Sequence, residues 1–379
     1  MTARILIAPD KFKGSLTAAE VADALRRGLI RARPDFDVRS SPVADGGDGT
    51  LAAALAAGFE PVPVTATGPR GEPVATAYAR RGDTAVIELA SVSGLSLLPQ
   101  GHLAPLDATS RGAGEVMATA LDAGCRRLVV GIGGSACTDG GAGMVEALGA
   151  RLYDADHHRL RPGGAALSSL AVLDLSAMRD LRDVTVVVAC DVNNPLTGPR
   201  GAAAVYGPQK GADHHQVQLL DMALDHWADV VADRIDQDLR EKAGAGSAGG
   251  VGFGAMALLG AELRSGIELV LDLIEFDAQL EGVDWVVVGE GSLDEQTLHG
   301  KAPVGVTARS RRAGAHVLAV CGRLAVDEAH LRSVGIEAAY ALTDLDPDPQ
   351  VCMRDAARLL EVLGEQLAPR FGEGRRHHD

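Results

Sequence analysis

The sequence has few of the features that mark secreted or membrane proteins. Its 379 residues include only five cysteines, an odd number with no CxxC pair among them. This pattern argues against a disulfide framework or a zinc knuckle and favours a reducing compartment. The longest apolar runs have the length of strands and are interrupted by Gly or Asp, far short of the roughly 20 residues that cross a bilayer. We therefore expect neither disulfide bonds nor a membrane helix.

Export and nucleic-acid binding are also disfavoured. The first apolar run stops at Pro9 and Asp10, without the longer apolar region that a signal peptide needs. Aromatic residues make up 3% of the chain and the formal net charge is −15, which opposes both base stacking and binding to phosphate backbones. We expect a cytoplasmic protein whose partners are small molecules.

The chain is rich in small apolar residues and glycine, as a packed globular protein should be: 46% of residues are hydrophobic and 46 are Gly. Of the 36 basic residues only five are Lys, and the other 31 are Arg. Four of the lysines lie in the Gly-containing segments KFKGS, GPQKGA and LHGKAP, where an ammonium can meet phosphate as a point charge. Chance placement is the alternative explanation.

The length predicts two domains. Residues 1–60 and 285–379 alternate strands with helices: RILIAPD, a helix over 17–30 and DVRSSPVAD at one end, and DWVVVGEG, HVLAVCGR and EAAYALTD at the other, before a final helix over 351–367. Such alternation predicts parallel strands. Together the two ends would form one discontinuous, flavodoxin-like domain of five parallel strands.

Residues 61–284 predict a second, mixed α/β domain. It begins with three short strands, PVPVTATG, VATAYAR and TAVIELA, whose connections are too short for parallel crossovers and which should be antiparallel. The strands RRLVVGIGG and VTVVVACD follow, each beside helical segments, and then a long helix over 213–239. The later segment EKAGAGSAGGVGFGAMALLGAEL is compatible with a flexible approach to a hinge or with a tightly packed helix.

The strongest chemical signal is GIGGSACTDGGAGMVEALGA, a glycine-rich loop between a strand and a helix. Glycines let the backbone approach an anion, and free N–H groups at a helix start bind phosphate oxygens. An ordinary tight turn is one alternative. Another is dinucleotide binding, because GIGGSA matches G-x-G-x-x-A and Asp154 lies near the expected position of a ribose-binding acid. Against it, DGGAG intervenes before the helix, whereas the dinucleotide fingerprint runs straight into one.

A second signal is a set of acids after predicted strands, where ligands bind in open α/β sheets. Phosphoryl transfer uses this mixture of groups, because carboxylates hold a divalent cation and another carboxylate accepts the proton of the attacking hydroxyl. Each acid alone is weak evidence, since Asp before Gly is a common turn residue. The acids are Asp10, Asp45, Asp191, Glu290 and Asp294.

The sequence lacks the motifs that mark several enzyme classes. There is no Walker A sequence, no HRD or DFG set of protein kinases and no G-x-S-x-G elbow. The His pairs at 157–158 and 214–215 lie in polar segments and should be solvated rather than metal-bound. Cys137 and Cys190 fit small core residues better than nucleophiles.

Many segments in order along the chain resemble the bacterial type I glycerate kinase family, up to about residue 322. They are IAPDKFKGSLTAAEVADAL, PVADGGDGT, TGPRGEPV, IELASVSGL, TSRGAGEVMATALDAG, GIGGSACTDGGAGMVEALGA, ACDVNNPLTGPRGAAAVYGPQKGA, GAGSAGGVGFGAMALLGAEL and GEGSLDEQTLHGKAPVGVT. The resemblance implies ATP- and Mg²⁺-dependent phosphorylation of D-glycerate, usually giving 2-phosphoglycerate. It also implies two lobes with the active site in the cleft between them.

At a few positions the chain differs from the residues that are more frequent in that family. Lys11 stands where Ser is expected, Cys137 and Thr138 where Thr and Asn are frequent, and Ser292 where Arg is frequent. None of these changes removes a candidate catalytic carboxylate. The last one puts in doubt any charge that an Arg would lend to substrate or phosphate.

The resemblance and the residue patterns together suggest a role for each candidate. Asp191 is the expected base for the glycerate hydroxyl, Lys13 a phosphate-facing charge, and Lys301 a group that reaches the glycerate carboxylate or the transferred phosphoryl group. The roles of the acids are interchangeable at this stage. The remaining assignments are Gly133, Gly134, Ser135, Asp139 and Gly140 for the nucleotide, Asp10, Ser15, Asn193, Asn194 and Thr297 for the substrate, and Asp45, Glu290 and Asp294 for Mg²⁺.

Two other functions stay open. One is a nicotinamide-dependent dehydrogenase of a small hydroxy acid, built on GIGGSA. The other is a module that binds glycerate or a carbohydrate without turning over ATP. The sequence also leaves open the phosphorylated oxygen, the preferred enantiomer and whether the chain forms a homodimer.

Overall fold

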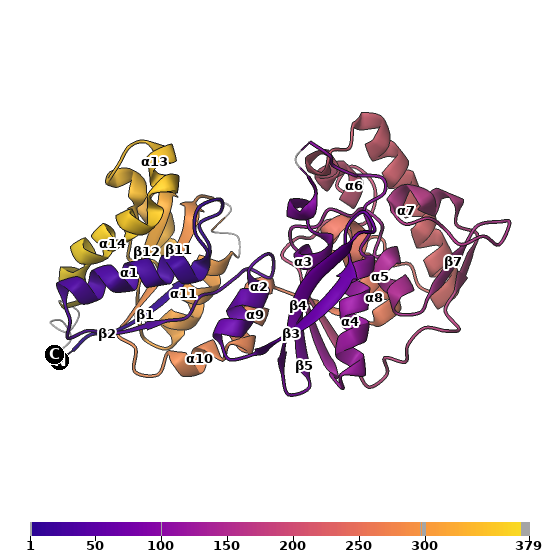
Figure 1. Ribbon diagram of the computed structural model, residues 1–379. Helices are drawn as coiled ribbons and strands as arrows, with labels where there is room; N and C mark the ends of the chain where they lie inside the picture. Colours follow the sequence, from indigo (N-terminus) through magenta and orange to yellow (C-terminus); the bar gives the residue numbers. More distant parts are fainter. Residues whose placement is uncertain (1, 100, 296, 298–300, 373–379) are drawn as a thin grey trace. The chain divides into compact units, whose positions relative to one another are not determined.

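The computed structural model describes residues 2–99, 101–295, 297 and 301–372 (Figure 1). The chain divides into two compact units. The first unit comprises Met1–Asp45, Ala52–Ala57 and Ile267–Asp379, and the second comprises Gly46–Leu51 and Gly58–Gly266. The class expected from the sequence is confirmed: both units are α/β, and the first is assembled from the two ends of the chain.

The first unit is built on a five-stranded parallel sheet in the order β2 (Asp37–Ser40), β1 (Arg4–Pro9), β11 (Trp285–Leu293), β12 (His316–Leu324) and β13 (Ala338–Ala341). This is the flavodoxin-like order, in which the chain moves to one side of β1 and then returns to its other side. Strand β1 (RILIAP), the second in this order, is apolar on both faces, as a strand covered by helices on both sides must be.

Helices cover both faces of this sheet. Ile5, Ile7 and Val287 pack in one cluster with side chains of α1 and α14, and Figure 1 shows these two helices side by side on the same face. Leu6 and Val286, which point the other way, pack in a second cluster with α9 and α11. The elements are β1, α1 (Ala18–Ala32), β2 (Asp37–Ser40), α9 (Gly266–Leu273), α10 (Phe276–Gln279), β11 (Trp285–Leu293), α11 (Ala302–Arg312), β12 (His316–Leu324), α12 (Glu328–Ser333), β13 (Ala338–Ala341), α13 (Pro349–Arg354) and α14 (Ala356–Leu367).

The second unit contains a six-stranded mixed sheet in the order β10-β9-β6-β5-β4-β3. The first four strands in that order are parallel, and β3–β4 and β4–β5 are antiparallel pairs, as the short connections predict. Its elements are β3 (Glu60–Thr67), β4 (Pro73–Arg81), β5 (Thr84–Glu88), α3 (Ala90–Ser93), α4 (Arg111–Asp122), β6 (Arg127–Gly131), α5 (Ala142–Ala147), β7 (Arg151–Tyr153), β8 (Val172–Asp174), β9 (Thr185–Ala189), α6 (Ala202–Tyr206), η3 (Pro208–Lys210), α7 (His214–Ile235), α8 (Ser247–Leu259) and β10 (Glu262–Arg264).

The unit boundaries differ from those expected along the chain. Residues 267–284 belong to the first unit, because Ile267 and Val270 of α9 pack in the same cluster as Leu6 and Val286. Residues 46–51 belong to the second unit, and helix α2 (Thr50–Ala56) starts there and continues into residues of the first.

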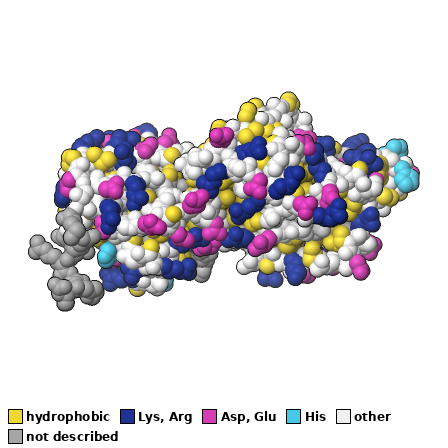
Figure 2. Space-filling view, turned by 90° about the horizontal axis from the view of Figure 1, so that it is seen from below, with side chains coloured by type: hydrophobic (Ala, Val, Ile, Leu, Met, Phe, Trp, Pro, Cys, Tyr) yellow, Lys and Arg dark blue, Asp and Glu magenta, His cyan; other side chains and the backbone are white. Residues whose placement is uncertain are grey.

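Two helices also differ from the prediction. The C-terminal helix over 351–367 is two helices, α13 and α14, which meet at Asp355. The Gly- and Ala-rich segment is α8, a packed helix whose first turn contains left-handed backbone at Ala248, Gly249 and Gly250. Of the described helices, none combines the length and the apolar character needed to span a membrane. On the face drawn in Figure 2, acidic and basic side chains are interspersed.

Candidate active site

Two acids of the first unit, one just after β1 and one within β11, lie at the point where its strand order reverses. β1 and β11 are parallel neighbours with Pro9 opposite Gly289, and the amide of Asp10 donates to the carbonyl of Gly289 at 2.8 Å. The next residues along these strands are therefore Asp10 and Glu290, side by side. Ligands of open α/β sheets bind outside this carboxyl edge.

Burial and mutual repulsion weaken the acidity of this pair. Asp10 is 8% exposed, and burial, reinforced by the Asp45 carboxylate, raises its pKa to about 7. Burial likewise raises the pKa of Glu290 to about 7, even though Thr297 donates a hydrogen bond to its carboxylate. Carboxyl groups held in this way gain from a cation placed among them.

The third metal candidate and its neighbours lie beyond the end of β11. The amide of Thr297 donates to Asp294 Oδ1 at 3.2 Å, and the amide of Asp294 donates to Thr297 Oγ1 at 3.1 Å. Lys301 Nζ lies 3.7 Å from Asp294 Oδ1. The structure therefore brings Glu290, Asp294, Thr297 and Lys301 into one group. Asp10 and Asp45 belong to the same group. We call Asp10, Asp45, Glu290 and Asp294 the acid cluster.

The lysine loop KFKGS lies against the same strand end. A Cβ on Gly291 of β11 would come within 3.3 Å of the backbone nitrogen of Lys13, and the Lys13 side chain is exposed. Ser15, which was expected to contact the substrate, also lies in this loop. Its hydroxyl donates to the carbonyl of Met353 at 2.5 Å, which ties the loop to α13.

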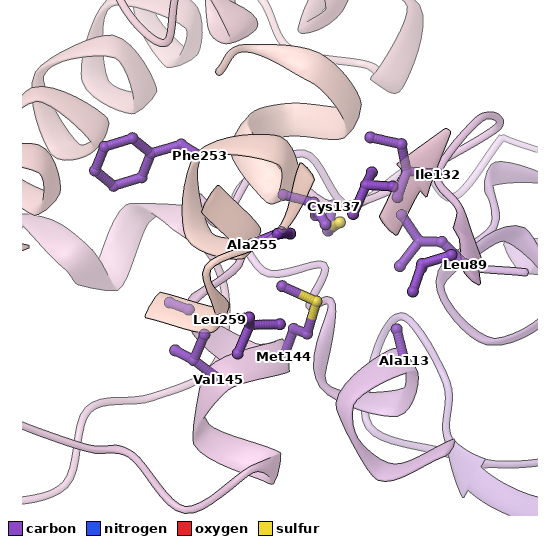
Figure 3. Packing of buried hydrophobic residues seen from close by; sticks show 14 of the residues in the cluster. Leu89, Ala113, Ile132, Cys137, Met144, Val145, Phe253, Ala255 and Leu259 are labelled. Atoms are coloured by element: carbon purple, nitrogen blue, oxygen red, sulfur yellow. The ribbon is translucent and has the colours of Figure 1, made fainter. Parts of the chain in front are cut away.

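The glycine-rich loop, residues 132–141, leaves β6 in the second unit. Gly134 is exposed with φ +73°, and Gly133 is half-buried so close to Gly47 that a Cβ would lie 2.6 Å from the Gly47 Cα. From Ser135 onward the loop is buried. Figure 3 shows Ile132 and Cys137, which belong to the loop, within the hydrophobic core. The backbone that can meet a ligand is thus its first part.

Asp139 and Gly140, both expected to contact nucleotide, face the protein interior. The Asp139 carboxylate is 1% exposed and accepts hydrogen bonds from the amide and hydroxyl of Ser110 at 2.7 and 2.9 Å, among others. A Cβ on Gly140 would lie 2.5 Å from Trp227, whose indole N–H donates to the Gly140 carbonyl at 3.0 Å. Both residues hold the loop in place.

The loop geometry disfavours the dinucleotide alternative. The fingerprint requires a helix to begin at its third position, which here is Ala136, yet α5 begins only at Ala142 and has six residues. The proposed ribose acid Asp154 instead accepts hydrogen bonds from the amides of Asp156 and His158 within a turn.

The candidate base lies at the same sheet edge as the loop. β9 is the neighbour of β6, and Asp191 follows it, exposed, with Oδ1 accepting from the amide of Gly266 at 2.9 Å. Asn193 is exposed as well. Asn194 is committed to the loop, because its side chain donates to the carbonyl of Arg200 and accepts from the hydroxyl of Tyr206, both at 2.7 Å.

Two buried charged residues of this unit were not among the assigned site residues, although Lys210 lies in GPQKGA, one of the segments in which a lysine can meet phosphate. Glu88 ends β5, is 7% exposed, and accepts from the amides of Gly49 and Leu51 at 3.2 and 3.1 Å. Lys210 is 2% exposed and bonds the glycine-rich loop. The sequence did contain a signal for each of them, because an acid that ends a buried strand and a lysine between glycines both need specific partners.

A Mg²⁺ ion at the acid cluster would need ligands in addition to the protein side chains. Within the described ranges, no three His, Cys, Asp or Glu side chains are placed to hold a metal ion by themselves. Mg²⁺ is usually held by one or two carboxylates together with substrate phosphates and water. Burial is the main cause that raises the pKa of Asp10 and Glu290, with nearby carboxylates as a lesser cause, so a cation would favour their charged forms.

Comparison with known proteins gives a consistent result. The Glycerate kinase family matches residues 5–371. A glycerate kinase of Bacillus subtilis (strain 168) is 43% identical over 369 residues, covering 96% of this chain and 97% of the relative. A glycerate 2-kinase of Escherichia coli (strain K12) is 43% identical over 344 residues, covering 89% and 90%. A crystal structure named as glycerate kinase 2 of Salmonella typhimurium LT2 has a TM-score of 0.85 at 40% identity, covering 99% of this chain and 100% of that one.

Proposed function

From the premise that the chain belongs to the glycerate kinase family and is an enzyme that phosphorylates glycerate, we propose that it transfers the γ-phosphoryl group of ATP to D-glycerate and forms 2-phosphoglycerate. The observation that carries the use of a metal–nucleotide complex is the acid cluster, in which buried carboxyl groups at the sheet's reversal point have raised pKa values. We also propose that the enzyme acts in the cytoplasm, where ATP is available.

The nucleotide phosphates are assigned to the first part of the glycine-rich loop. Gly133 and Gly134 lack side chains and reach the surface, so their backbone can approach an anion closely. Ser135 follows them with its hydroxyl already accepting from Lys210. Asp139 and Gly140 act behind the loop, as anchors.

The acceptor side of the reaction is assigned to Asp191 and the groups near Thr297. Asp191 takes the proton of the glycerate hydroxyl while that oxygen forms a bond to the γ-phosphorus and the bond from phosphorus to the ADP oxygen breaks. Its hydrogen bond from the Gly266 amide holds the carboxylate in place. Lys301 and Lys13 supply positive charge for the glycerate carboxylate or the transferred group.

The acid cluster would hold Mg²⁺. Asp45, Glu290 and Asp294 are the proposed ligands, with Asp10 beside them. When bound, the ion neutralises charge on the nucleotide phosphates. Thr297, which donates to Glu290, keeps that carboxylate oriented.

The test is a coupled assay of ADP release with purified protein, ATP, Mg²⁺ and D-glycerate, followed by ³¹P NMR of the product. ADP should appear only when glycerate is present, together with an equal amount of a phosphate ester on the C2 oxygen. Glycerate-dependent reduction of a nicotinamide cofactor without ADP release would favour a dehydrogenase. Glycerate binding without any turnover would favour a binding module.

A further inference from the structure

Lys210 is an unusual lysine because its charged end is inside the protein. It ends η3, is 2% exposed and is among the largest fully buried side chains of the described residues. Burying an ammonium is costly unless hydrogen-bond partners compensate for the lost water. Packing of an apolar core does not call for a lysine at this position. The hydrogen-bond partners of Lys210 therefore indicate its role.

Both partners of Lys210 belong to the glycine-rich loop. Nζ donates to the hydroxyl of Ser135 at 3.0 Å and to the carbonyl of Cys137 at 2.5 Å. These two acceptors directly follow Gly133 and Gly134, the part of the loop that reaches the surface. The ammonium therefore fixes the backbone just behind the proposed phosphate contacts.

The segment that carries Lys210 is itself held firmly. Its amide donates to the carbonyl of Gly207, and Gly211, at φ +93°, lies so close to Leu103 that a Cβ would come within 2.7 Å of that side chain. Tight turns on both sides of the lysine leave its chain little freedom. Lys210 therefore makes its hydrogen bonds to the loop from a backbone position that is held in place.

The charge of Lys210 is poorly compensated by its neighbours. The Cys137 thiol stays neutral at physiological pH, because burial raises its pKa to about 12. The Asp139 carboxylate acts on the lysine but is bonded to Ser110. Burial lowers the pKa of Lys210, which means that the ammonium gains from any anion brought near it.

We propose that Lys210 is a positioning residue for nucleotide binding: it holds Ser135 and Cys137 so that Gly133 and Gly134 present their amides to the polyphosphate, and it places a positive charge behind them. This inference rests on the proposed function and deepens it. It predicts that Lys210 affects recognition of phosphates and leaves recognition of adenosine and glycerate unchanged.

The test compares Lys210→Met with Lys242→Met, which removes an exposed lysine from the same unit. The KM for ATP, the KM for glycerate and kcat are measured, together with inhibition constants for tripolyphosphate and for adenosine. In Lys210→Met the KM for ATP and the inhibition constant for tripolyphosphate should both rise by roughly tenfold or more, as loss of a charge-assisted contact does. The glycerate KM and adenosine inhibition should stay within about twofold, and Lys242→Met should match the wild type.

Two outcomes would overturn the inference. Unchanged ATP and tripolyphosphate constants in folded Lys210→Met would show that the lysine does not act on phosphates. Equal weakening of all ligands would show a general structural role. If Lys210→Met does not fold, Lys210→Gln, which keeps an amide donor without charge, is held to the same criteria. A wild-type protein that binds neither ATP nor tripolyphosphate would instead refute the proposed function.

Discussion

Asp10 is held in an environment that disfavours its charge. Burial and the Asp45 carboxylate raise its pKa to about 7, from 3.8 for an exposed aspartate. The folded protein therefore binds more protons than the unfolded chain between about pH 4 and 7, and this contribution to stability declines as the pH rises through that window. The buried acid thus lowers stability at a place where we propose that a cation binds.

Asp10→Asn should therefore stabilise the protein at alkaline pH. Asn keeps an oxygen that can accept the hydrogen bond from the Lys11 amide, which is 2.7 Å in the wild type, and it carries no charge. At pH 8 the melting temperature should rise by roughly 3 °C or more, and the gain should shrink as the pH falls from about 7 toward 4. Differential scanning calorimetry across that range provides the measurement.

The matched control is Asp37→Asn, an exposed aspartate at the amino end of β2 in the same sheet. It should leave the melting temperature unchanged at either pH. An Asp10→Asn variant that melts below the wild type at pH 8 would show that the carboxylate is stabilised in the fold, against this account.

Asp191→Asn should separate chemistry from folding. Asn retains an oxygen for the hydrogen bond from the Gly266 amide, so the local backbone should not change. Loss of the general base should lower kcat by roughly a hundredfold or more, while the melting temperature stays near that of the wild type. Steady-state kinetics measure the change in kcat, and thermal melting shows whether the fold is retained.

Asp183→Asn is the control, because Asp183 is exposed just before the amino end of the same strand β9. It should keep wild-type turnover. Wild-type turnover in Asp191→Asn as well would remove Asp191 from the mechanism.

The residues that sequence patterns singled out fall into two groups. Asp10, Glu290 and Asp191 could be placed because strand ends in parallel sheets share an edge, which the alternation of strands and helices already predicts. Asp139, Gly140 and Asn194 were expected to contact ligands but are occupied by Ser110, Trp227 and Tyr206. These partners lie about 12 to 90 positions away along the chain, so no local sequence pattern could have predicted the contacts.

Among the helices, α1 and α14 approach one another unusually closely. A Cβ on Gly28 would lie 2.1 Å from the carbonyl oxygen of Glu361, and one on Gly364 would lie 2.7 Å from that of Leu25. Glycines on both helices therefore let the backbones touch, and Arg27 adds an ion pair to Glu361 at 2.6 Å. This packing closes one face of the first unit's sheet.

Gly28→Ala should destabilise the protein although alanine favours helix formation. The added methyl group would meet backbone, which cannot move aside cheaply, and should cost about 1–3 kcal/mol in the free energy of unfolding. That exceeds the gain of about 1 kcal/mol in helix propensity. Urea denaturation measures the difference.

Arg26→Ala, on the exposed side of α1, tests propensity alone and should change the free energy of unfolding by less than about 0.5 kcal/mol. A Gly28→Ala variant as stable as the wild type would mean that the two helices pack less closely than described.

The types of the elements were predictable, whereas some ends were not. Thr17 and Glu20 form a capping box, so the start of α1 could be inferred to within one residue. The break between α13 and α14 was missed because the apolar periodicity continues through Asp355, whose backbone leaves the helical range at φ −106° and ψ 19°.

For the molecule as a whole, two sheets supply the proposed chemistry, each at its carboxyl edge. The strand order β2-β1-β11-β12-β13 gathers acids at one reversal point, and the order β9-β6-β5 places Asp191, the glycine-rich loop and Glu88 on adjacent strands. The sequence predicted the five parallel strands of the first sheet and five of the six strands of the second, but not β10. It did not predict that residues 267–284 pack with the first unit, because that grouping depends on which sheet face α9 covers.

The most direct test of the central claim is hydrogen–deuterium exchange of the whole chain, with and without saturating Mg²⁺ and a non-hydrolysable ATP analogue. The account predicts that peptides containing Gly133 and Gly134 exchange more slowly when the nucleotide is bound, while those from edge strand β3 do not change. Bound nucleotide that leaves exchange at Gly133 and Gly134 unaltered would contradict the assignment of the phosphates to this loop.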